Sequence, residues 1–480
     1  MIPLTVEEVA AAVSGRVVGV DPDARLTDVV VDSRAAGPGT MFVAIAGERV
    51  DGHDFAAAAV AAGSLVVLSG RALSDPSGAA LPCIVVDDPV LALGRLAAMV
   101  RRDRLGCKVV AITGSSGKTS TKDLTAAVLR GAGRTVSAVG SFNTEVGVPL
   151  TILSADESTE FLVLEMGMRG AGHISYLVGL ADPDVGVLIN VGSAHLGMLG
   201  SREAIVEAKG EIVRDLRPGS TAVLSGDDAL IRALADETPA DALLFGESDV
   251  CDVRADEVVL DDSARASFRL TRESTGEFGR VELRVAGEHQ VANATAAAAV
   301  ALALHVPFAT VLRELSTAEP ASRWRMEIVE APGGVTVVND AYNANPESMR
   351  AALKALAVMG RGRRTWAVLG EMRELGDAAL EEHDAIGRLA VRLDISRLIC
   401  VGDATRVMHL AAANEGSWDN ESMHVADADE AIEVLLREVR PGDVVLVKAS
   451  RSIGLERVAE ALLVEGATHG ERPTQGEVRG

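Results

Sequence analysis

Short apolar runs alternate with longer amphipathic stretches along most of the chain. An apolar run bounded by turn residues is typical of a buried strand, and apolar positions three or four residues apart are typical of a helix. In residues 1–106 this pattern predicts strands at 29–31, 41–45, 65–68 and 84–86, and helices at 54–62 and 89–103. We expect this first block to form a small α/β domain.

The second block, residues 107–320, repeats the alternation around stronger apolar runs. Strands are predicted at 109–112, 161–164, 185–189 and 222–224, with helical stretches between them. This order indicates a mostly parallel sheet. Residues 251–285 instead alternate apolar and charged positions, which predicts an antiparallel edge, and an alanine-rich helix is expected at 289–304.

The third block, residues 321–465, alternates again. Strands are predicted at 335–339, 366–369, 398–401 and 443–447, and helices at 346–359, 379–393, 428–438 and 454–464. This block is expected to form a Rossmann-like, doubly wound domain. Residues 466–480 are polar and rich in glycine, and we expect a disordered tail. The sequence thus predicts an α/β protein of three domains.

Composition supports this division and excludes some partners. A chain of 480 residues is too long for one core, and about 150 residues per domain suggests three. The net charge of −23 disfavours nucleic acid and anionic membranes as partners. Four scattered cysteines, no signal-peptide pattern and no long uncharged apolar stretch predict a cytoplasmic protein without membrane insertion. We expect a monomer.

A glycine-rich loop follows the predicted strand at 109–112 and precedes a helical pattern. Its core is Gly114-Ser115-Ser116-Gly117-Lys118-Thr119, followed by Ser120. In such a loop the backbone N–H groups face phosphate oxygens, the lysine adds a positive charge and the threonine hydroxyl can bind Mg²⁺. ATP is therefore the expected partner. The long form of the motif has a glycine where this chain has Ile112, so a chance glycine–serine turn is the alternative.

Polar residues follow the next strands of the second block. Glu165 ends the strand at 161–164, and Asn190 and His195 follow the strand at 185–189. Since the carboxyl ends of parallel strands share one edge, these groups are expected beside the loop, where a carboxylate and a hydroxyl would suit Mg²⁺. The alternatives are a solvated or ion-paired strand end for Glu165 and a helix N-terminal or core imidazole for His195.

Other polar residues of the second block are open to two interpretations. Composition alone places Lys209 on the surface of an exposed helix. Asn143 and Thr144 lie in a polar, glycine-containing loop, where they could bind substrate or only form a turn. Asn293 interrupts the alanine-rich helix, which indicates a hydrogen-bonded role, either structural or in adenine binding.

In the third block, polar clusters follow two predicted strands. Residues 339–346 include Asp340, Asn343 and Asn345, and this composition also suits a helix N-cap. The second cluster, Lys448-Ala449-Ser450-Arg451, could recognise an anion. Arg325 precedes the first strand of the block, where a basic residue at a domain junction could reach phosphates.

Four stretches together resemble the Mur ligase family, the ATP-dependent amide-bond ligases of peptidoglycan precursor synthesis. These stretches are residues 113–119, 141–149, 339–346 and 369–376. The resemblance covers about residues 25–460, and the short form of the phosphate loop is the form that the family uses. The last two stretches resemble the branch of the family that adds D-alanyl-D-alanine.

The resemblance implies roles for individual residues. It implies that Thr119, Glu165 and His195 contribute to two Mg²⁺ sites and that Lys209 aligns with the family's carbamylated lysine. It also implies that Asn293 faces the adenine. Arg325 and Asp340 would approach the γ-phosphate and the ribose.

The first block carries a weaker part of the resemblance. Residues 32–34 and 47–55 resemble the family's uridine-diphosphate-binding segments, which points to Ser33, Arg34, Asp51 and His53. At residues 449–451 this chain has Ala-Ser-Arg where many relatives have Gly-Ser-Arg, which leaves Ser450 and Arg451 available but departs from the family pattern at residue 449.

The resemblance implies a reaction that joins D-alanyl-D-alanine to UDP-N-acetylmuramoyl-tripeptide through an acyl phosphate, with ATP and Mg²⁺. A sister ligase of the family or a folylpolyglutamate synthetase would keep the chemistry but change the amine. A nucleotide-dependent switch of the GTPase kind is an alternative from another class. Such a switch normally has an Asn-Lys-x-Asp motif, which the sequence lacks.

Overall fold

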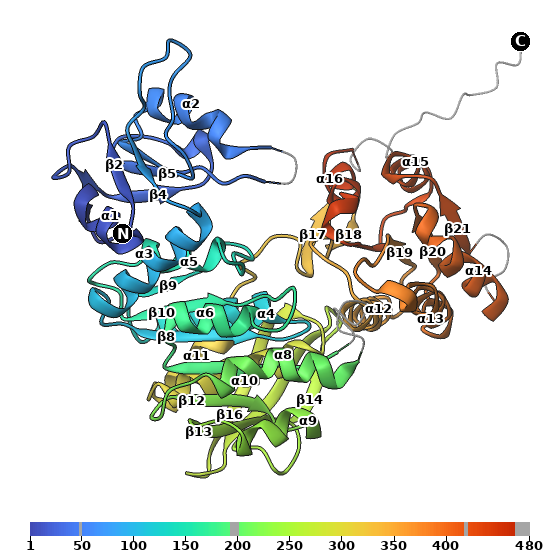
Figure 1. Cartoon of the computed structure of the whole chain (residues 1–480). Coiled ribbons are helices and arrows are strands. Elements are labelled where there is room, and N and C mark those ends of the chain that lie inside the picture. The colour runs from blue at the N-terminus through green and yellow to red at the C-terminus, as the bar shows by residue number, and fades with distance from the viewer. Residues whose placement is uncertain (48–49, 193–200, 417–420, 466–480) are drawn as a thin grey trace, which may run out of the picture.

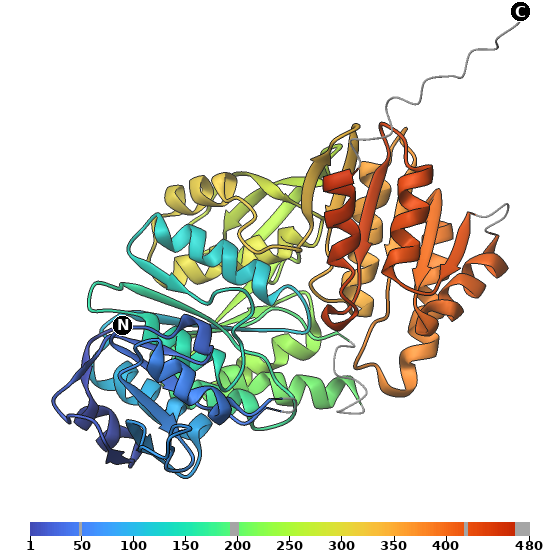
Figure 2. The same ribbon diagram turned by 90° about the horizontal axis from the view of Figure 1, so that it is seen from above.

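The computed structural model describes residues 1–47, 50–192, 201–416 and 421–465. Three larger β-sheets with flanking helices follow one another along the chain (Figure 1). The sheets near the two ends of the chain lie on opposite sides of the molecule (Figures 1 and 2), and the largest sheet lies below both of them in Figure 1. The sheets are mixed and mostly parallel, which confirms the predicted α/β class.

The N-terminal sheet has five strands in the order β2-β7-β6-β5-β4. Strands β4 (Asp28–Val30), β5 (Thr40–Val43), β6 (Val66–Ser69) and β7 (Cys83–Val85) are parallel, and β2 (Arg16–Val18) is antiparallel to β7. Helix α2 (Ala56–Ala61) is shorter than predicted because its first turn is a separate 3₁₀ helix, Gly52–Phe55. Helix α1 (Val6–Val13) was not predicted.

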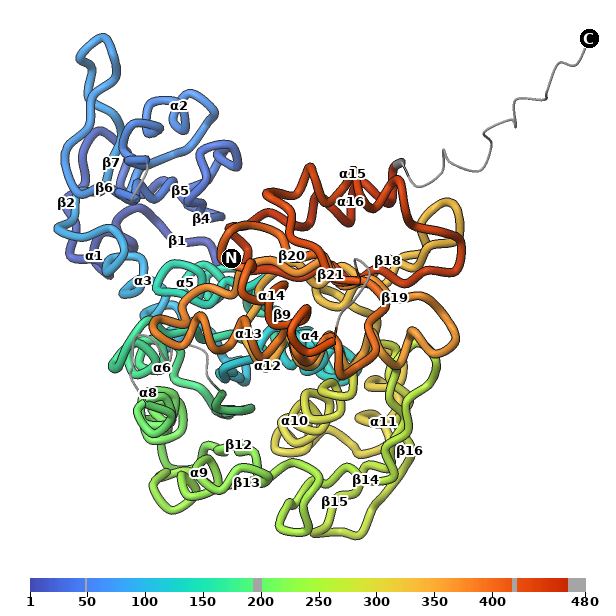
Figure 3. The backbone as a smooth tube through the Cα atoms, turned by 90° about the vertical axis from the view of Figure 1, so that its right-hand side faces the viewer, coloured from blue at the N-terminus to red at the C-terminus, as the bar shows by residue number. Residues whose placement is uncertain are grey.

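The central sheet has nine strands in the order β16-β15-β14-β13-β12-β11-β8-β10-β9. Strand β8 (Lys108–Thr113) lies between β10 (Phe161–Glu165) and β11 (Val185–Leu188), and all three are parallel. The remaining strands are β9 (Thr135–Ser137), β12 (Thr221–Ser225), β13 (Asp241–Gly246), β14 (Val253–Leu260), β15 (Arg265–Arg272) and β16 (Glu277–Ala286). Strands β14, β15 and β16 pair antiparallel, as predicted, on the side away from the N-terminal sheet (Figure 3).

Helices cover both faces of the central sheet. One face packs against α4 (Lys118–Arg130), α10 (Gln290–Ala303) and α11 (Phe308–Thr317). The other packs against α5 (Gly147–Ser154), α6 (His173–Ala181) and α8 (Arg202–Arg214). Helix α3 (Pro89–Asp103) follows the N-terminal sheet but packs against α5 and α6, so the first two parts of the chain share one hydrophobic core.

The C-terminal sheet has six strands in the order β17-β18-β22-β19-β20-β21. They are β17 (Glu327–Ala331), β18 (Val335–Asn339), β19 (Thr365–Leu369), β20 (Arg397–Val401), β21 (Ser422–Val425) and β22 (Val444–Lys448), and only β17 is antiparallel. Helices α12 (Pro346–Met359), α13 (Ala379–Arg392) and α14 (Arg406–Glu415) cover one face. Helices α15 (Ala428–Glu438) and α16 (Glu456–Glu465) cover the other.

Two further features bear on the predictions from composition. All four cysteines, Cys83, Cys107, Cys251 and Cys400, are buried free thiols. Within the part of the chain that the structure describes, no helix has both the length and the apolar character needed to cross a bilayer. The predicted tail, residues 466–480, lies outside the described residues.

Candidate functional site

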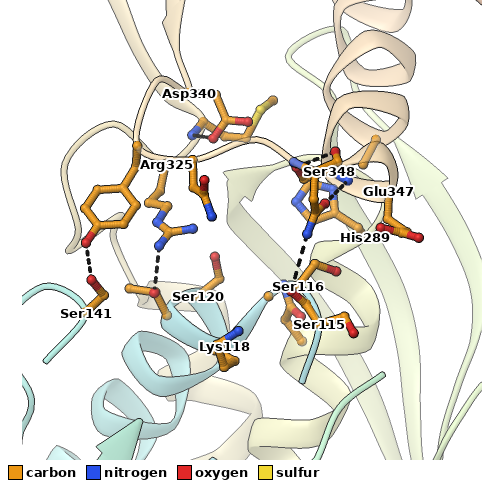
Figure 4. Close-up of a pocket in the computed structure, with 18 of the residues that line it drawn as sticks. Ser115, Ser116, Lys118, Ser120, Ser141, His289, Arg325, Asp340, Glu347 and Ser348 are labelled. Carbon is orange, nitrogen blue, oxygen red and sulfur yellow. Dashed lines mark hydrogen bonds between the residues drawn. The ribbon is translucent and has the colours of Figure 1, made fainter. Parts of the chain in front are cut away.

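A cavity of about 500 Å³ lies between the central and C-terminal sheets. The loop after β8 and the start of α4 form one wall, and the loops after β18 and β22 contribute to the other (Figure 4). A second cavity of about 480 Å³ adjoins the first, and both are lined by Ser115, Lys118, Asn143, Asn343 and Asn345. The site lies where β8 separates β10 from β11, a switch point of strand order at which α/β sheets commonly bind ligands.

Gly117 shapes the loop because its backbone has a φ of 78°, which disfavours residues with a side chain. A Cβ atom there would also lie 2.5 Å from Asn293 Oδ1. Lys118 follows at the start of α4, and its Nζ donates to the carbonyl oxygen of Gly114 over 2.7 Å. Burial lowers the pKa of Lys118, while the charge of Glu165 opposes that shift. A bound phosphate would therefore stabilise the charged lysine.

Asn190, after β11, holds the phosphate loop through two hydrogen bonds to the backbone of Ser116. Its Oδ1 accepts from the backbone N–H of Ser116 and its Nδ2 donates to the carbonyl oxygen of Ser116, each over 3.0 Å. The Oγ of Ser115 accepts from the N–H of Gly192 over 2.9 Å. Ser120 also lines the cavity. The loop thus has a fixed shape with helix N–H groups at one end, which suits an anion.

Thr119 and Glu165 form a pair of oxygen donors beside the loop. The Thr119 hydroxyl donates to Glu165 Oε2 over 2.8 Å, and Asn143 Nδ2 donates to Oε1 over 2.7 Å. Glu165 is only 1% exposed, so the alternative of a solvated strand end is wrong. A hydroxyl and an oriented carboxylate are oxygen ligands of the kind that Mg²⁺ prefers, so these residues fit that ion.

The predicted third member of this set, His195, lies outside the described residues. Among the residues that are described, no group of three or more His, Cys, Asp or Glu side chains could hold a metal ion.

Lys209 lies on α8 directly behind the phosphate loop. It is 1% exposed, and its Nζ donates to the carbonyl oxygen of Gly114 over 3.3 Å. The expectation from composition of an exposed surface lysine is therefore wrong, because this face of α8 packs against the core. Burial, with a smaller contribution from the charge of Lys118, holds the pKa of Lys209 well below its usual value.

Arg325 reaches the phosphate loop from the C-terminal part. Its Nη2 donates to Thr119 Oγ1 over 2.9 Å, and its guanidinium lies 4.2 Å from the ring centre of Tyr342. The Tyr342 hydroxyl forms a hydrogen bond with Ser141 of the central part (Figure 4). The Nε of Arg325 is buried and has no hydrogen-bond partner in the described part of the chain. An unpaired buried donor beside the phosphate loop fits an anionic ligand.

Asp340 follows β18 on the same wall (Figure 4). Lys448 Nζ donates to Asp340 Oδ2 over 2.6 Å and to the carbonyl oxygen of Asn343 over 2.9 Å. Asp340 Oδ1 accepts from the backbone N–H of Met326. Burial lowers the pKa of Lys448, and the charge of Asp340 opposes that shift. Lys448 therefore ties the ends of β18 and β22 together.

Asn345 has two contacts. Its side chain caps α12 by accepting from the N–H of Ser348 over 2.9 Å, which confirms the predicted N-cap. Its Nδ2 donates across the cavity to the carbonyl oxygen of Ser115 over 3.3 Å. Together with the Arg325 and Tyr342 contacts, this bond joins the C-terminal part to the phosphate-loop side.

The remaining predicted residues of this region line one or both of the cavities. Thr144 Oγ1 accepts from the backbone N–H of Gly147 over 3.4 Å, and Ser450 Oγ accepts from the backbone N–H of Arg373 over 2.9 Å. The guanidinium of Arg451 lies over the ring of Trp324, 4.3 Å from its centre. Asn293, on α10, lines the first cavity, and its Nδ2 donates to Gln290. Ser450 and Arg451 follow β22, whereas Thr144 lies in the loop before α5 and Asn293 lies on α10.

Ser33, Arg34, Asp51 and His53 lie elsewhere, at the carboxyl edge of the N-terminal sheet. Arg34 pairs with Asp32 and holds the pKa of that carboxyl at about 2. His53 pairs with Asp51 at 2.5 Å, and its Nε2 accepts from the backbone N–H of Gly70 after β6. The structure thus gathers these residues at one edge, apart from the two cavities.

Several residues of the site were not predicted. Ser141, Tyr342, Gln290, Glu347 and Ser348 line the first cavity, and His289 lines it with a buried Nδ1 that lacks a hydrogen-bond partner among the described residues. Ser141 and Tyr342 lie in residues 141–149 and 339–346, two of the stretches that resemble the family, so the sequence did contain a signal for them. Their contact with each other was not, because it joins residues 201 positions apart.

Comparison with known proteins places these features in a family. Residues 25–101 match the Mur ligase family catalytic domain, 112–301 the Mur ligase middle domain, and 324–451 the Mur ligase glutamate ligase domain. The chain is 45% identical to the UDP-N-acetylmuramoyl-tripeptide–D-alanyl-D-alanine ligase of Mycobacterium tuberculosis. That alignment covers 98% of this chain and all of the relative.

Solved structures give the same result. MurF from Acinetobacter baumannii superimposes with a TM-score of 0.85 at 32% identity, covering 96% of this chain and 99% of that one. MurF from Thermotoga maritima, solved in complex with ADP, superimposes with a TM-score of 0.77 at 29% identity, covering 91% and 97%. Matches over the whole length, in sequence and in fold, show that the chain belongs to the Mur ligase family.

Proposed function

We propose that this protein is an ATP-dependent ligase that joins D-alanyl-D-alanine to UDP-N-acetylmuramoyl-tripeptide and forms the pentapeptide precursor of peptidoglycan. The observation that carries the proposal is the meeting of the phosphate loop with Arg325 and Asn345 across one cavity, beside a second cavity of similar size. Nucleotide and peptide can then react at a shared boundary. The names of the similar proteins support the same reaction.

The reaction proceeds through an acyl phosphate. A carboxylate oxygen of the tripeptide attacks the γ-phosphorus of ATP, and the bond to the β-phosphate oxygen breaks to release ADP. The free amine of D-alanyl-D-alanine then attacks the acyl carbon, the amine loses a proton, and phosphate leaves. Lys118 and Arg325 offset the negative charge that these steps bring together, so catalysis depends mainly on positioning and electrostatic stabilisation.

Mg²⁺ would be held by Thr119, Glu165 and His195, in two sites, and when bound it supplies further positive charge at the phosphates. We also propose that Lys209 is carbamylated: its neutral amine adds to CO₂ with loss of a proton. The lowered pKa of Lys209 supports this step, because only the neutral amine has the lone pair that reacts. The product is an anion that can face the second Mg²⁺.

We propose the other sites from the family resemblance, and the positions of the lining residues support them. Asn293 faces the adenine, and Asp340 the ribose. The tripeptide and dipeptide occupy the second cavity, which is lined by Asn143, Thr144, Asn343, Asn345, Ser450 and Arg451. The uridine diphosphate binds at the N-terminal sheet edge, which carries Ser33, Arg34, Asp51 and His53.

We propose that the chain has domains at residues 1–106, 107–320 and 321–465. We also propose that the protein is a monomer in the cytoplasm.

Phosphate release from ATP tests the function. With UDP-N-acetylmuramoyl-tripeptide present, we expect release that depends on D-alanyl-D-alanine, and Lys118→Met should lower the rate by about 100-fold or more because it removes transition-state charge stabilisation. Single amino acids replace the dipeptide in parallel reactions. Release with a single amino acid but not with the dipeptide would indicate a sister ligase. No acceptor-dependent release at all would indicate a nucleotide switch.

A further inference from the structure

Lys122 is a buried charge that the proposed reaction does not use. It lies on α4, one turn after Thr119, and is 1% exposed. Its Nζ donates to the carbonyl oxygens of Ala138 and Gly140 over 2.8 and 2.9 Å, and lies 2.9 Å from Asp123 Oδ1. An ammonium group has three donors, so this lysine is fully paired. A buried charge that is fully paired and faces two carbonyls of one loop holds that loop in place.

The loop that Lys122 holds connects β9 to α5 and carries two contacts of the site. Asn143 donates to Glu165 Oε1 over 2.7 Å and so orients the carboxylate that also accepts from Thr119. Ser141 bonds to Tyr342, whose ring lies against Arg325. Residues 138–146 lie outside regular secondary structure. Besides Lys122, two backbone bonds hold this loop: the N–H of Ala138 donates to the carbonyl oxygen of Val163 over 3.2 Å, and the N–H of Gly167 donates to the carbonyl oxygen of Asn143 over 2.7 Å. Lys122 is the side chain that holds the part between these two bonds, at the carbonyl of Gly140.

Two rings of contacts close through α4. One runs from Thr119 through Glu165 and Asn143 to the loop, and returns to α4 through Lys122. The other runs from Thr119 through Arg325 and Tyr342 to Ser141 in the same loop, and returns by the same lysine. Lys122 is the member common to both rings that lies outside the cavity.

We infer that Lys122 is a positioning residue, which rests on the proposed function. It fixes residues 138–143 so that Asn143 aims Glu165 at the cation and Ser141 receives Tyr342. Its side chain contacts neither nucleotide nor peptide, so its loss acts through the loop. Residues that orient metal ligands in this indirect way commonly change metal affinity or activity by roughly 10-fold to 100-fold when they are replaced.

Equilibrium binding of adenylyl imidodiphosphate, with and without Mg²⁺, tests the inference by calorimetry. In Lys122→Met, affinity without Mg²⁺ should stay close to that of the wild type, while the gain in affinity on adding Mg²⁺ should fall by roughly 10-fold. Lys108→Met is the matched control, since Lys108 lies at the opposite end of β8 and pairs with Asp184. Its gain from Mg²⁺ should equal that of the wild type.

A double-mutant cycle separates positioning from a general structural effect. In the wild-type background, Asn143→Ala should lower the gain in nucleotide affinity that Mg²⁺ produces. In the Lys122→Met background the same substitution should change this gain little, because Asn143 and Lys122 both act through the loop at residues 138–143. Additive effects, or a folded Lys122→Met with an unchanged Mg²⁺ gain, would overturn the inference. If Lys122→Met does not fold, the same binding measurements are made on Lys122→Gln, which loses the charge but keeps an amide donor. An unchanged gain in affinity on adding Mg²⁺ in folded Lys122→Gln would likewise overturn the inference.

Phosphate release by the wild type in the same preparation keeps the two proposals apart. If the wild type shows no release that depends on D-alanyl-D-alanine, the proposed function fails, whatever the binding data show. If the wild type turns over and Lys122→Met has an unchanged Mg²⁺ gain, only the inference about Lys122 fails.

Discussion

The proposed carbamylation of Lys209 would give one buried residue a chemistry that its type does not suggest. A lysine ammonium is a poor neighbour for Mg²⁺, and here it lies behind the phosphate loop with Lys118 close enough to disfavour its charge. Burial is the larger cause, because removal from water disfavours the charged form of the amine. Carbamylation would then replace an unfavourable cation with an anion at a position where anions are needed.

Replacement of this lysine should be reversible by a small carboxylate. We expect Lys209→Ala to lose most phosphate release and to recover part of it in acetate, because acetate can fill the cavity and restore the negative charge. Lys354→Ala, on the exposed side of α12, is the control and should be unaffected in both buffers. Full activity of Lys209→Ala without acetate would contradict the carbamate.

The same residue predicts a dependence on pH. As pH falls through the lowered pKa of Lys209, the amine becomes protonated and can no longer react with CO₂, so wild-type activity should fall on the acid side. Lys209→Ala rescued by acetate lacks this amine, and its rate should fall less over the same range. If activity falls equally at low pH in the wild type and in the rescued variant, a group other than Lys209 causes the fall.

At the scale of elements, most strands and helices were predicted because strands appear as short apolar runs and helices as apolar positions three or four residues apart. Strands β18, β19, β20 and β22 lie within one residue of their predicted bounds. Helix α1 was missed although Thr5 and Glu8 form a capping box, a signal that the sequence does contain. Strand β21 and helix α14 were missed as well.

The site could be predicted in part for the same reason. Strand ends pointed to Thr119, Glu165 and Asn190, since parallel strands bring their carboxyl ends to one edge. The burial of Lys122 and Lys209 could not be predicted, because their surroundings come from loops and helices distant in sequence. Lysine is rarely buried unless it is paired, and sequence alone does not show the partner.

Asn345 both caps α12 and bonds to the phosphate loop, and two substitutions can measure these effects separately. Asn345→Ala should lower the free energy of unfolding by about 1 kcal/mol through loss of the α12 cap. Asn345→Ser keeps a capping oxygen but cannot reach the carbonyl of Ser115, so its stability should stay near that of the wild type while its turnover falls. Denaturant unfolding and phosphate release report the two effects. Equal stability of both variants would rule out the cap.

At the scale of the whole molecule, the three parts are not joined in the same way. The N-terminal and central parts share one apolar core through α3, α5 and α6. The C-terminal part has its own cores on the two faces of its sheet, and among the described residues only Ala264 and Ala286 of the central part join them. Its other contacts at the cavity, described above, are polar. We therefore expect the C-terminal part to move relative to the other two.

Calorimetry should reveal this difference. Without nucleotide we expect two unfolding transitions, one for the N-terminal and central parts together and one for the C-terminal part, because cooperativity follows shared cores. A nucleotide that contacts both sides of the cavity should raise both transitions and bring them closer. A single transition without nucleotide, with equal calorimetric and van't Hoff enthalpies, would contradict the division.

The four buried thiols give each part of the molecule its own chemical reporter. Cys83 lies in β7, Cys107 and Cys251 border the central sheet, and Cys400 lies in β20 of the C-terminal sheet. Burial raises the pKa of Cys107, Cys251 and Cys400, so an alkylating reagent finds little thiolate while those parts are folded. The order in which the cysteines become labelled then records the order in which the parts of the chain open.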